Sequence, residues 1–188
     1  FNAITVDSDT STNDMVAIFA TGKAKNLKIY NILDPKLQDF EKALHRLCLN
    51  LAKQIVVDGE GAKKFITIKV LGARSSAMAK NVAFSIANSP LVKTAIAGED
   101  PNWGRIIMAC GKSGENISPN KIQLKIGDYL VTDQGKEAKG YNEKNVKQYM
   151  KWDSINIEVN LNIGNATYTA YTCDLTHDYI DINADYRN

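Results

Sequence analysis

Residues 155–163 read INIEVNLNI and decide the fold, because apolar and polar side chains alternate at every position. An extended strand places successive side chains on opposite faces, so this pattern predicts a strand with one buried face. The dipeptide Gly164-Asn165 is typical of a tight turn, and the alternation resumes from Tyr168 to Thr172. The sequence therefore predicts a hairpin made of these two strands.

Upstream of this hairpin, the clearest element is a long helix. Asp34 is suited to cap its first turn, Pro35 to occupy its first helical position, and Asp58-Gly59 to end it. Between these ends, apolar residues recur at helical spacing, at Leu37, Phe40, Leu44, Leu47, Leu51 and Ile55. One face of this helix is therefore predicted to be buried.

Shorter patterns occupy the rest of the chain. We expect strands at 1–6, 27–30, 65–71, 93–97, 122–126, 129–132 and 179–183, and helices at 11–21, 75–88, 100–110 and 142–152. Helices and strands alternate early, and a strand-rich part with one helix follows. This order predicts α/β and α+β architecture: a layered α/β domain in residues 1–95 and a smaller α+β domain in residues 96–188, with the boundary placed to within about 15 residues.

Composition and charge exclude several function classes. The net charge of +2 and the scattered lysines do not suit a nucleic-acid or membrane partner. Cys48, Cys110 and Cys173 are far apart, lack the spacing of a zinc site and indicate a reducing, cytosolic protein. No apolar run reaches the roughly 18 residues that span a bilayer. Residues 1–6 have neither a signal-peptide pattern nor an initiator Met, and we expect a segment upstream of them.

A loop with two glycines, Asp58-Gly59-Glu60-Gly61-Ala62, joins the long helix to the next strand. The glycines allow the backbone to come close to a ligand, and they leave the carboxylate of Glu60 uncovered. An ordinary surface loop has a similar composition, so the spacing alone leaves both interpretations open.

The residues alone give no complete catalytic set. Neither His45 nor His177 has the partners of a triad, and no Ser or Cys lies in a GxSxG turn. Residues 98–105, GEDPNWGR, form a dense polar turn that we interpret as architectural. The chain end after Ile182 is unusual, because it carries amide, carboxylate, phenol and guanidinium groups where termini are normally simple.

Four stretches together resemble the β chain of glutamate N-acetyltransferases, also called ornithine acetyltransferases. They are ITVDSDTSTND at 4–14, DGEGA at 58–62, GEDPNWGR at 98–105, and the ending with DLT at 174–176 and INADYR at 182–187. They occur in the family's order and cover the chain from end to end. The chain thus resembles the C-terminal part of that β chain.

The resemblance implies an N-terminal-nucleophile-like α-β-β-α fold and a precursor that cuts itself before a threonine. This threonine takes acetyl from N-acetylornithine and passes it to glutamate in arginine synthesis, through a covalent acetyl-enzyme. It lies upstream of Phe1, so no catalytic residue is expected in this chain and the fragment alone is expected to be inactive. No metal or cofactor is implied, and acetyl-CoA is an additional donor in bifunctional members.

The same resemblance assigns substrate binding to Glu60, Asn183 and Asn188, the last of which stands where the family usually has Thr or Ser. A carboxylate suits the ammonium group of ornithine or glutamate. We expect the last strand to return to the active site beside the Glu60 loop. The implied partners are the α chain and the N-terminal part of the β chain, in an αβ heterodimer that pairs into a heterotetramer in the cytoplasm.

Two alternatives stay open at this point. A related N-terminal-nucleophile aminopeptidase or amidase would hydrolyse its substrate. A non-catalytic binding module would neither transfer an acetyl group nor hydrolyse a substrate. Acetyl transfer to glutamate, as opposed to release of free acetate, separates the first alternative from an acetyltransferase.

Overall fold

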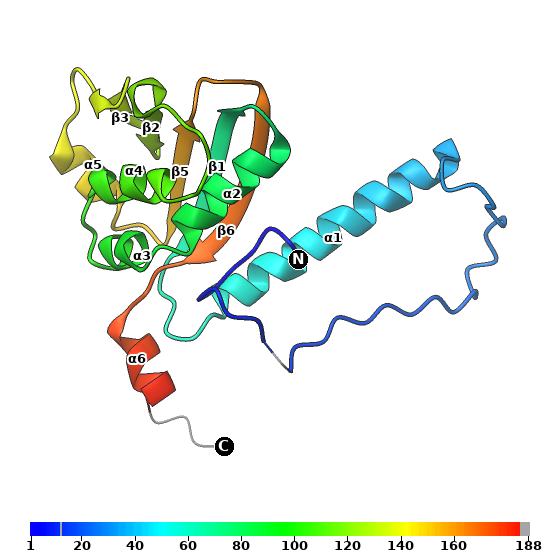
Figure 1. Cartoon of the computed structure of the whole chain (residues 1–188). Helices are drawn as coiled ribbons and strands as arrows, with labels where there is room; N and C mark the ends of the chain where they lie inside the picture. Colours follow the sequence, from blue (N-terminus) through cyan, green and yellow to red (C-terminus); the bar gives the residue numbers. More distant parts are fainter. Residues whose placement is uncertain (12, 185–188) are drawn as a thin grey trace.

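The structure is a computed structural model that describes residues 1–11 and 13–184, and within these residues one six-stranded mixed sheet carries the fold (Figure 1). The strand order across the sheet is β4-β3-β2-β5-β1-β6. Its strands are β1 (Phe65–Ala73), β2 (Gln123–Ile126), β3 (Tyr129–Asp133), β4 (Lys136–Glu137), β5 (Ser154–Asn160) and β6 (Ala166–Cys173).

The predicted hairpin between β5 and β6 is wrong, although both strands are present. β1 lies between them, parallel to β5 and antiparallel to β6, with Ile66 opposite both Ile155 and Thr172. The turn after β5 therefore passes over the end of β1, where a side chain at Gly164 would collide with the main-chain oxygen of Ala73. The alternation identified the strands, but their pairing depended on a third strand distant in sequence.

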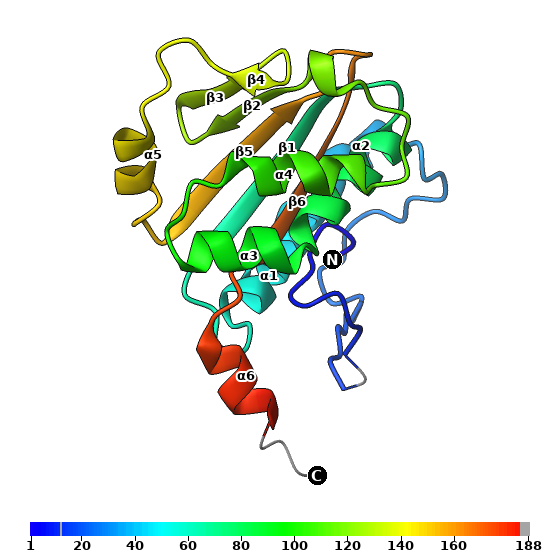
Figure 2. The same ribbon diagram turned by 60° about the vertical axis from the view of Figure 1, so that its left-hand side comes forward.

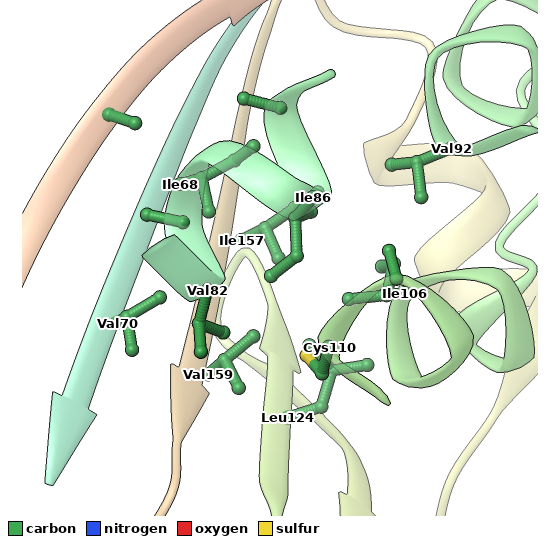
Figure 3. Close-up of a cluster of buried hydrophobic side chains, with 14 of the residues drawn as sticks. Ile68, Val70, Val82, Ile86, Val92, Ile106, Cys110, Leu124, Ile157 and Val159 are labelled. Atoms are coloured by element: carbon green, nitrogen blue, oxygen red, sulfur yellow. The ribbon is translucent and has the colours of Figure 1, made fainter. Parts of the chain in front are cut away.

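Three helices cover one face of the sheet (Figure 2). They are α2 (Ser76–Ala87), α3 (Pro90–Ala97) and α4 (Trp103–Gly111). The hydroxyl of Ser75, the first residue of the predicted helix at 75–88, accepts a hydrogen bond from the N–H of Met78 and caps α2. The core lies between these helices and the sheet, as Figure 3 shows, and includes Ile68, Val70, Val82, Ile86, Val92, Ile106, Cys110, Leu124, Ile157 and Val159.

The long helix is confirmed as a 3-10 turn, η1 (Pro35–Leu37), followed by α1 (Gln38–Val57), and it lies beside β6. The carboxylate of Asp34 accepts a hydrogen bond from the N–H of Lys36 at the predicted cap. Of the residues in α1, Ala52 and Val56 are buried, whereas Phe40 and Leu47 of the predicted apolar face are more than half exposed. The apolar face thus exists but is largely uncovered in this chain.

The predicted helix at 11–21 and the predicted strand at 27–30 are not formed. The hydroxyl of Ser11 does accept hydrogen bonds from the N–H groups of Asn13 and Asp14, so the cap is in place. However, Met15 and Phe19 are 86% and 85% exposed. A short helix is stabilised mainly by packing its apolar face, and that packing is missing here. The predicted strand at 1–6 is reduced to one bridge between Ile4 and Tyr171.

Two further predicted strands are helices. Residues 93–97 belong to α3, because Pro90 occupies the first turn of that helix and Val92, Lys93 and Ile96 are buried at helical spacing. Residues 179–183 belong to α6 (His177–Ala184), which extends away from the sheet (Figure 1). A strand there would need a neighbouring strand for its backbone hydrogen bonds, whereas a helix forms them internally.

Two further helical elements are η2 (Pro119–Lys121) and α5 (Glu143–Tyr149). Asn142, the first residue of the predicted helix at 142–152, caps α5. The α/β class is confirmed. The division near residue 95 stays a prediction, and β1 and β5, which pair with each other, lie on opposite sides of it. Among the described residues, no helix is both long and apolar enough to cross a membrane.

Candidate functional site

The candidate site begins in the loop between α1 and β1, which carries Glu60. Asp58 ends α1, with its N–H bonded to the carbonyl oxygen of Gln54 at 2.9 Å. Gly61 has a φ of +67°, and a side chain on it would lie within 2.8 Å of the main-chain carbon of Asp178. The close backbone approach that we expected for a ligand is therefore made by α6.

The structure brings Asn183 to Glu60 across 123 positions of sequence. The side-chain amide of Asn183 donates to a carboxylate oxygen of Glu60 at 2.7 Å and to the carbonyl oxygen of Tyr179 at 2.9 Å. Glu60 and Asn183 are both exposed, so the pair is open to solvent. The role of these residues in substrate binding stays a prediction, and Asn188 lies outside the described residues.

A second contact fixes α6 to the start of the chain. The hydroxyl of Tyr179 donates to a carboxylate oxygen of Asp7 at 3.0 Å. Burial raises the pKa of Tyr179, and the hydrogen bond and charge of Asp7 raise it further, followed by the charges of Glu60 and Asp9. The phenol keeps its proton and remains a donor, and three carboxylates lie near it.

The base of the Glu60 loop is held by Asp174, at the end of β6. One carboxylate oxygen of Asp174 accepts hydrogen bonds from the N–H groups of Lys63 and Lys64, each at 2.9 Å. The hydroxyl of Thr176 donates to the carbonyl oxygen of Gly61 at 2.7 Å. On the surface, Lys63 forms an ion pair with Asp178 at 2.9 Å. The loop and the segment leading into α6 are thus joined at several points.

A buried lysine lies beneath this junction. Lys93 is only 3% exposed, and its ammonium donates to the carbonyl oxygens of Val6 and Cys173 and to the hydroxyl of Thr172. Burial lowers the pKa of Lys93, and interactions with Cys173, Asp174 and Asp7 oppose that shift. Lys93 therefore joins α3, β6 and the first residues of the chain.

Sequence reasoning missed Lys93, Asp174 and Tyr179 as members of this site. Lys93 is the one charged residue in α3, and that isolation among apolar residues was the available signal. Asp174 lies in the DLT stretch that carries part of the family resemblance, but the contacts of Asp174 and Tyr179 have no local signal, because each is made with a segment more than 100 residues away.

The family model described as the ArgJ family matches residues 1–188, which is the whole chain.

This chain belongs to the ArgJ family.

The match confirms the resemblance seen in the sequence. Similar proteins include the arginine biosynthesis bifunctional protein ArgJ of Brucella melitensis, 50% identical over all of this chain, and that of Gluconobacter oxydans, 51% identical. This chain spans 46% and 44% of those two ArgJ proteins. A crystal structure of ArgJ from Bacillus halodurans is similar with a TM-score of 0.93 and 48% identity, covering 99% of this chain and 87% of that chain.

The other motifs of this chain have architectural contacts. In the polar turn at 98–105, the guanidinium of Arg105 donates to the carbonyl oxygen of Leu91 at 2.9 Å and so ties α4 to α3. Glu99 lies 3.7 Å from the ammonium of Lys64. His45 and His177 are exposed on α1 and α6. The part of the chain that the structure describes has no group of three or more His, Cys, Asp or Glu residues arranged to hold a metal ion.

Proposed function

We propose that this chain is part of an acetyltransferase that moves acetyl from N-acetylornithine to glutamate. The observation that carries the proposal is the match to the ArgJ family over the whole chain, together with relatives named arginine biosynthesis bifunctional proteins. In the proposed reaction, a threonine outside this chain attacks the acetyl carbonyl and the amide C–N bond breaks. The amine takes a proton and leaves as ornithine, and the amine of glutamate then takes the acetyl group from the threonine ester.

Glu60 and Asn183 are proposed to bind the amino group of the substrate. Both N–H groups of the Asn183 amide are used, one on Glu60 and one on Tyr179, so its oxygen is the group it can offer to a ligand. The Glu60 carboxylate retains acceptor sites beyond the one used by Asn183. Both residues thus present acceptors, and these suit an ammonium group, with a charge-assisted hydrogen bond to Glu60. Asn188 is proposed as a third substrate contact.

The proposed partners are the α chain and the N-terminal part of the β chain of the same precursor, in an αβ heterodimer that pairs into a heterotetramer in the cytoplasm. Large apolar side chains along residues 13–33 and α1 support a covering partner, because monomeric proteins rarely expose extended apolar patches. The most exposed of them are Met15, Ile18, Phe19, Leu27, Tyr30, Ile32 and Leu33. The proposed reaction requires no cofactor. Acetyl-CoA is proposed as an additional acetyl donor.

A labelled-acetyl assay on the complete protein containing this sequence tests the proposal. N-acetylornithine with a labelled acetyl group is incubated with glutamate, and the products are separated. The expected result is label in N-acetylglutamate, with one ornithine released for each acetyl transferred. Label in free acetate at the same rate with and without glutamate would indicate a hydrolase and overturn the proposal.

A further inference from the structure

Asp174 is a buried carboxylate that contacts the backbone of the Glu60 loop. It is 3% exposed, and one of its oxygens accepts the two N–H groups that follow the loop, those of Lys63 and Lys64. Its own N–H donates to the carbonyl oxygen of Lys64 at 3.2 Å. Its other oxygen is buried and has no hydrogen-bond partner in residues 1–11 and 13–184. The hydrogen bonds of this carboxylate are thus made to the backbone that follows the Glu60 loop.

Thr176 makes a second contact on the same side of Glu60. Its hydroxyl donates to the carbonyl oxygen of Gly61 at 2.7 Å. On the other side, the N–H of Gly59 donates to the carbonyl oxygen of Val56 in the last turn of α1. Glu60 is thus the residue between two anchored points, one on α1 and one on the segment 174–176.

The segment 174–176 is itself anchored by Lys93. The Lys93 ammonium donates to the carbonyl oxygen of Cys173, the residue directly before Asp174, and to the hydroxyl of Thr172. Its positive charge lies close enough to Asp174 for the two to interact electrostatically. A buried carboxylate that lacks a direct ion pair is costly, and a nearby buried cation offsets part of that cost. Lys93 therefore holds the backbone directly before Asp174 in place.

We propose that Asp174 and Thr176 are positioning residues that set substrate affinity through Glu60. The inference rests on the proposed function, because its consequence is measured as substrate binding. The same segment leads directly into α6, which carries Asn183 and its 2.7 Å contact with Glu60. By fixing the Glu60 loop against the start of α6, Asp174 and Thr176 fix the spacing between Glu60 and Asn183. Neither positioning residue needs to touch the substrate.

The test is a pair of double-mutant cycles in the complete enzyme, with KM and kcat measured separately for glutamate. Asp174→Asn removes the charge and keeps the shape, and Thr176→Val removes the hydroxyl bonded to Gly61. Each should raise KM by about three- to tenfold, which corresponds to the free energy of one hydrogen bond. The change in kcat should be smaller than the change in KM. In a Glu60→Gln background, each should raise KM by less than about twofold, because residues that act through one another are not additive.

Thr132→Val is the matched control. Thr132 is a fully buried threonine in β3 whose hydroxyl has no partner in the described part of the chain, and β2 and β5 separate β3 from β1. It should leave KM unchanged in either background. If Asp174→Asn and Thr176→Val leave KM at the wild-type value, or raise it by the same factor with and without Glu60→Gln, the positioning role is overturned. Should Asp174→Asn fail to fold, the Thr176→Val cycle decides alone. Absence of acetyl transfer in the wild-type enzyme would instead refute the proposed function.

Discussion

At the scale of single residues, Gly61 is a position where the Glu60 loop packs directly against the backbone of α6. Its φ is +67°, and an added side chain would meet the backbone of Asp178 and Tyr179. Backbone atoms cannot swing aside as a flexible side chain can. Gly61 is therefore required both by its conformation and by the space that α6 occupies.

Gly61→Ala should destabilise the packing of α6 against the Glu60 loop. Gly114→Ala is the control that separates backbone strain from the steric overlap with α6. Gly114 has a φ of +78° with nothing within 4 Å of the added atom, so its replacement carries only the backbone strain of roughly 1 kcal/mol. Amide hydrogen exchange in residues 177–184 should become at least about tenfold faster in Gly61→Ala and stay at the wild-type rate in Gly114→Ala. Equal exchange rates in both variants would show that α6 does not depend on this contact.

The residues of the site were only partly predictable from the sequence. Glu60 was recognisable as an exposed carboxylate between two glycines, but the spacing could not separate a site from a surface loop. Asn183 was singled out by family resemblance, since nothing in its local sequence indicates a contact with a residue 123 positions away. The hydrogen bonds of Lys93 and Asp174 depend on tertiary packing, which local patterns do not contain.

At the scale of elements, the residues that cap helices were the most informative signals in the sequence. Asp34, Ser75 and Asn142 each cap the predicted helix, because a cap is a local interaction within a few residues. The errors arose where the outcome depended on neighbours. β6 pairs with β1 and not with β5, and residues 179–183 form a helix, with no strand of residues 1–11 and 13–184 beside them.

The helical state of α6 has a direct test in Ile180→Pro. A proline there removes a backbone donor and crowds the preceding turn, which costs about 3 kcal/mol in a helix. Ile180 is 58% exposed, so the core should not be disturbed. In the complete enzyme the substrate KM should rise at least about tenfold, because Asn183 loses its position beside Glu60, whereas Ile180→Ala should change KM by less than about twofold. A wild-type KM in Ile180→Pro would mean that α6 is not needed for binding.

At the scale of the whole molecule, the uncovered apolar residues are the main feature to account for. The predicted helix at 11–21 has its cap but lacks a packing partner, and the apolar face of α1 is exposed. The chain spans 46% of the length of the Brucella melitensis relative. Both facts agree with a surface that other parts of the precursor cover.

Hydrogen exchange can test whether that surface is covered. Amides of residues 13–33 should exchange rapidly in the isolated 188-residue chain and be protected by at least about tenfold in the complete protein. Residues of β1 and β5, each of which has a neighbouring strand on both sides, serve as the internal reference and should be protected in both. Equal exchange of residues 13–33 in the two proteins would contradict the proposed partner surface.

The central claim is that the exposed carboxylate of Glu60 binds the ammonium group of the substrate, and Glu60→Gln in the complete enzyme tests it most directly. Glu115→Gln is the matched control, because Glu115 also accepts a hydrogen bond from an asparagine, Asn81, at 2.6 Å on the surface. Losing one charge-assisted contact costs about 1.5–3 kcal/mol, which corresponds to about a 10- to 100-fold rise in KM. We predict that rise for Glu60→Gln with the proposed self-cleavage unaffected, and a wild-type KM for Glu115→Gln. Wild-type KM and kcat in Glu60→Gln would contradict the account and leave Glu60 as an ordinary loop residue.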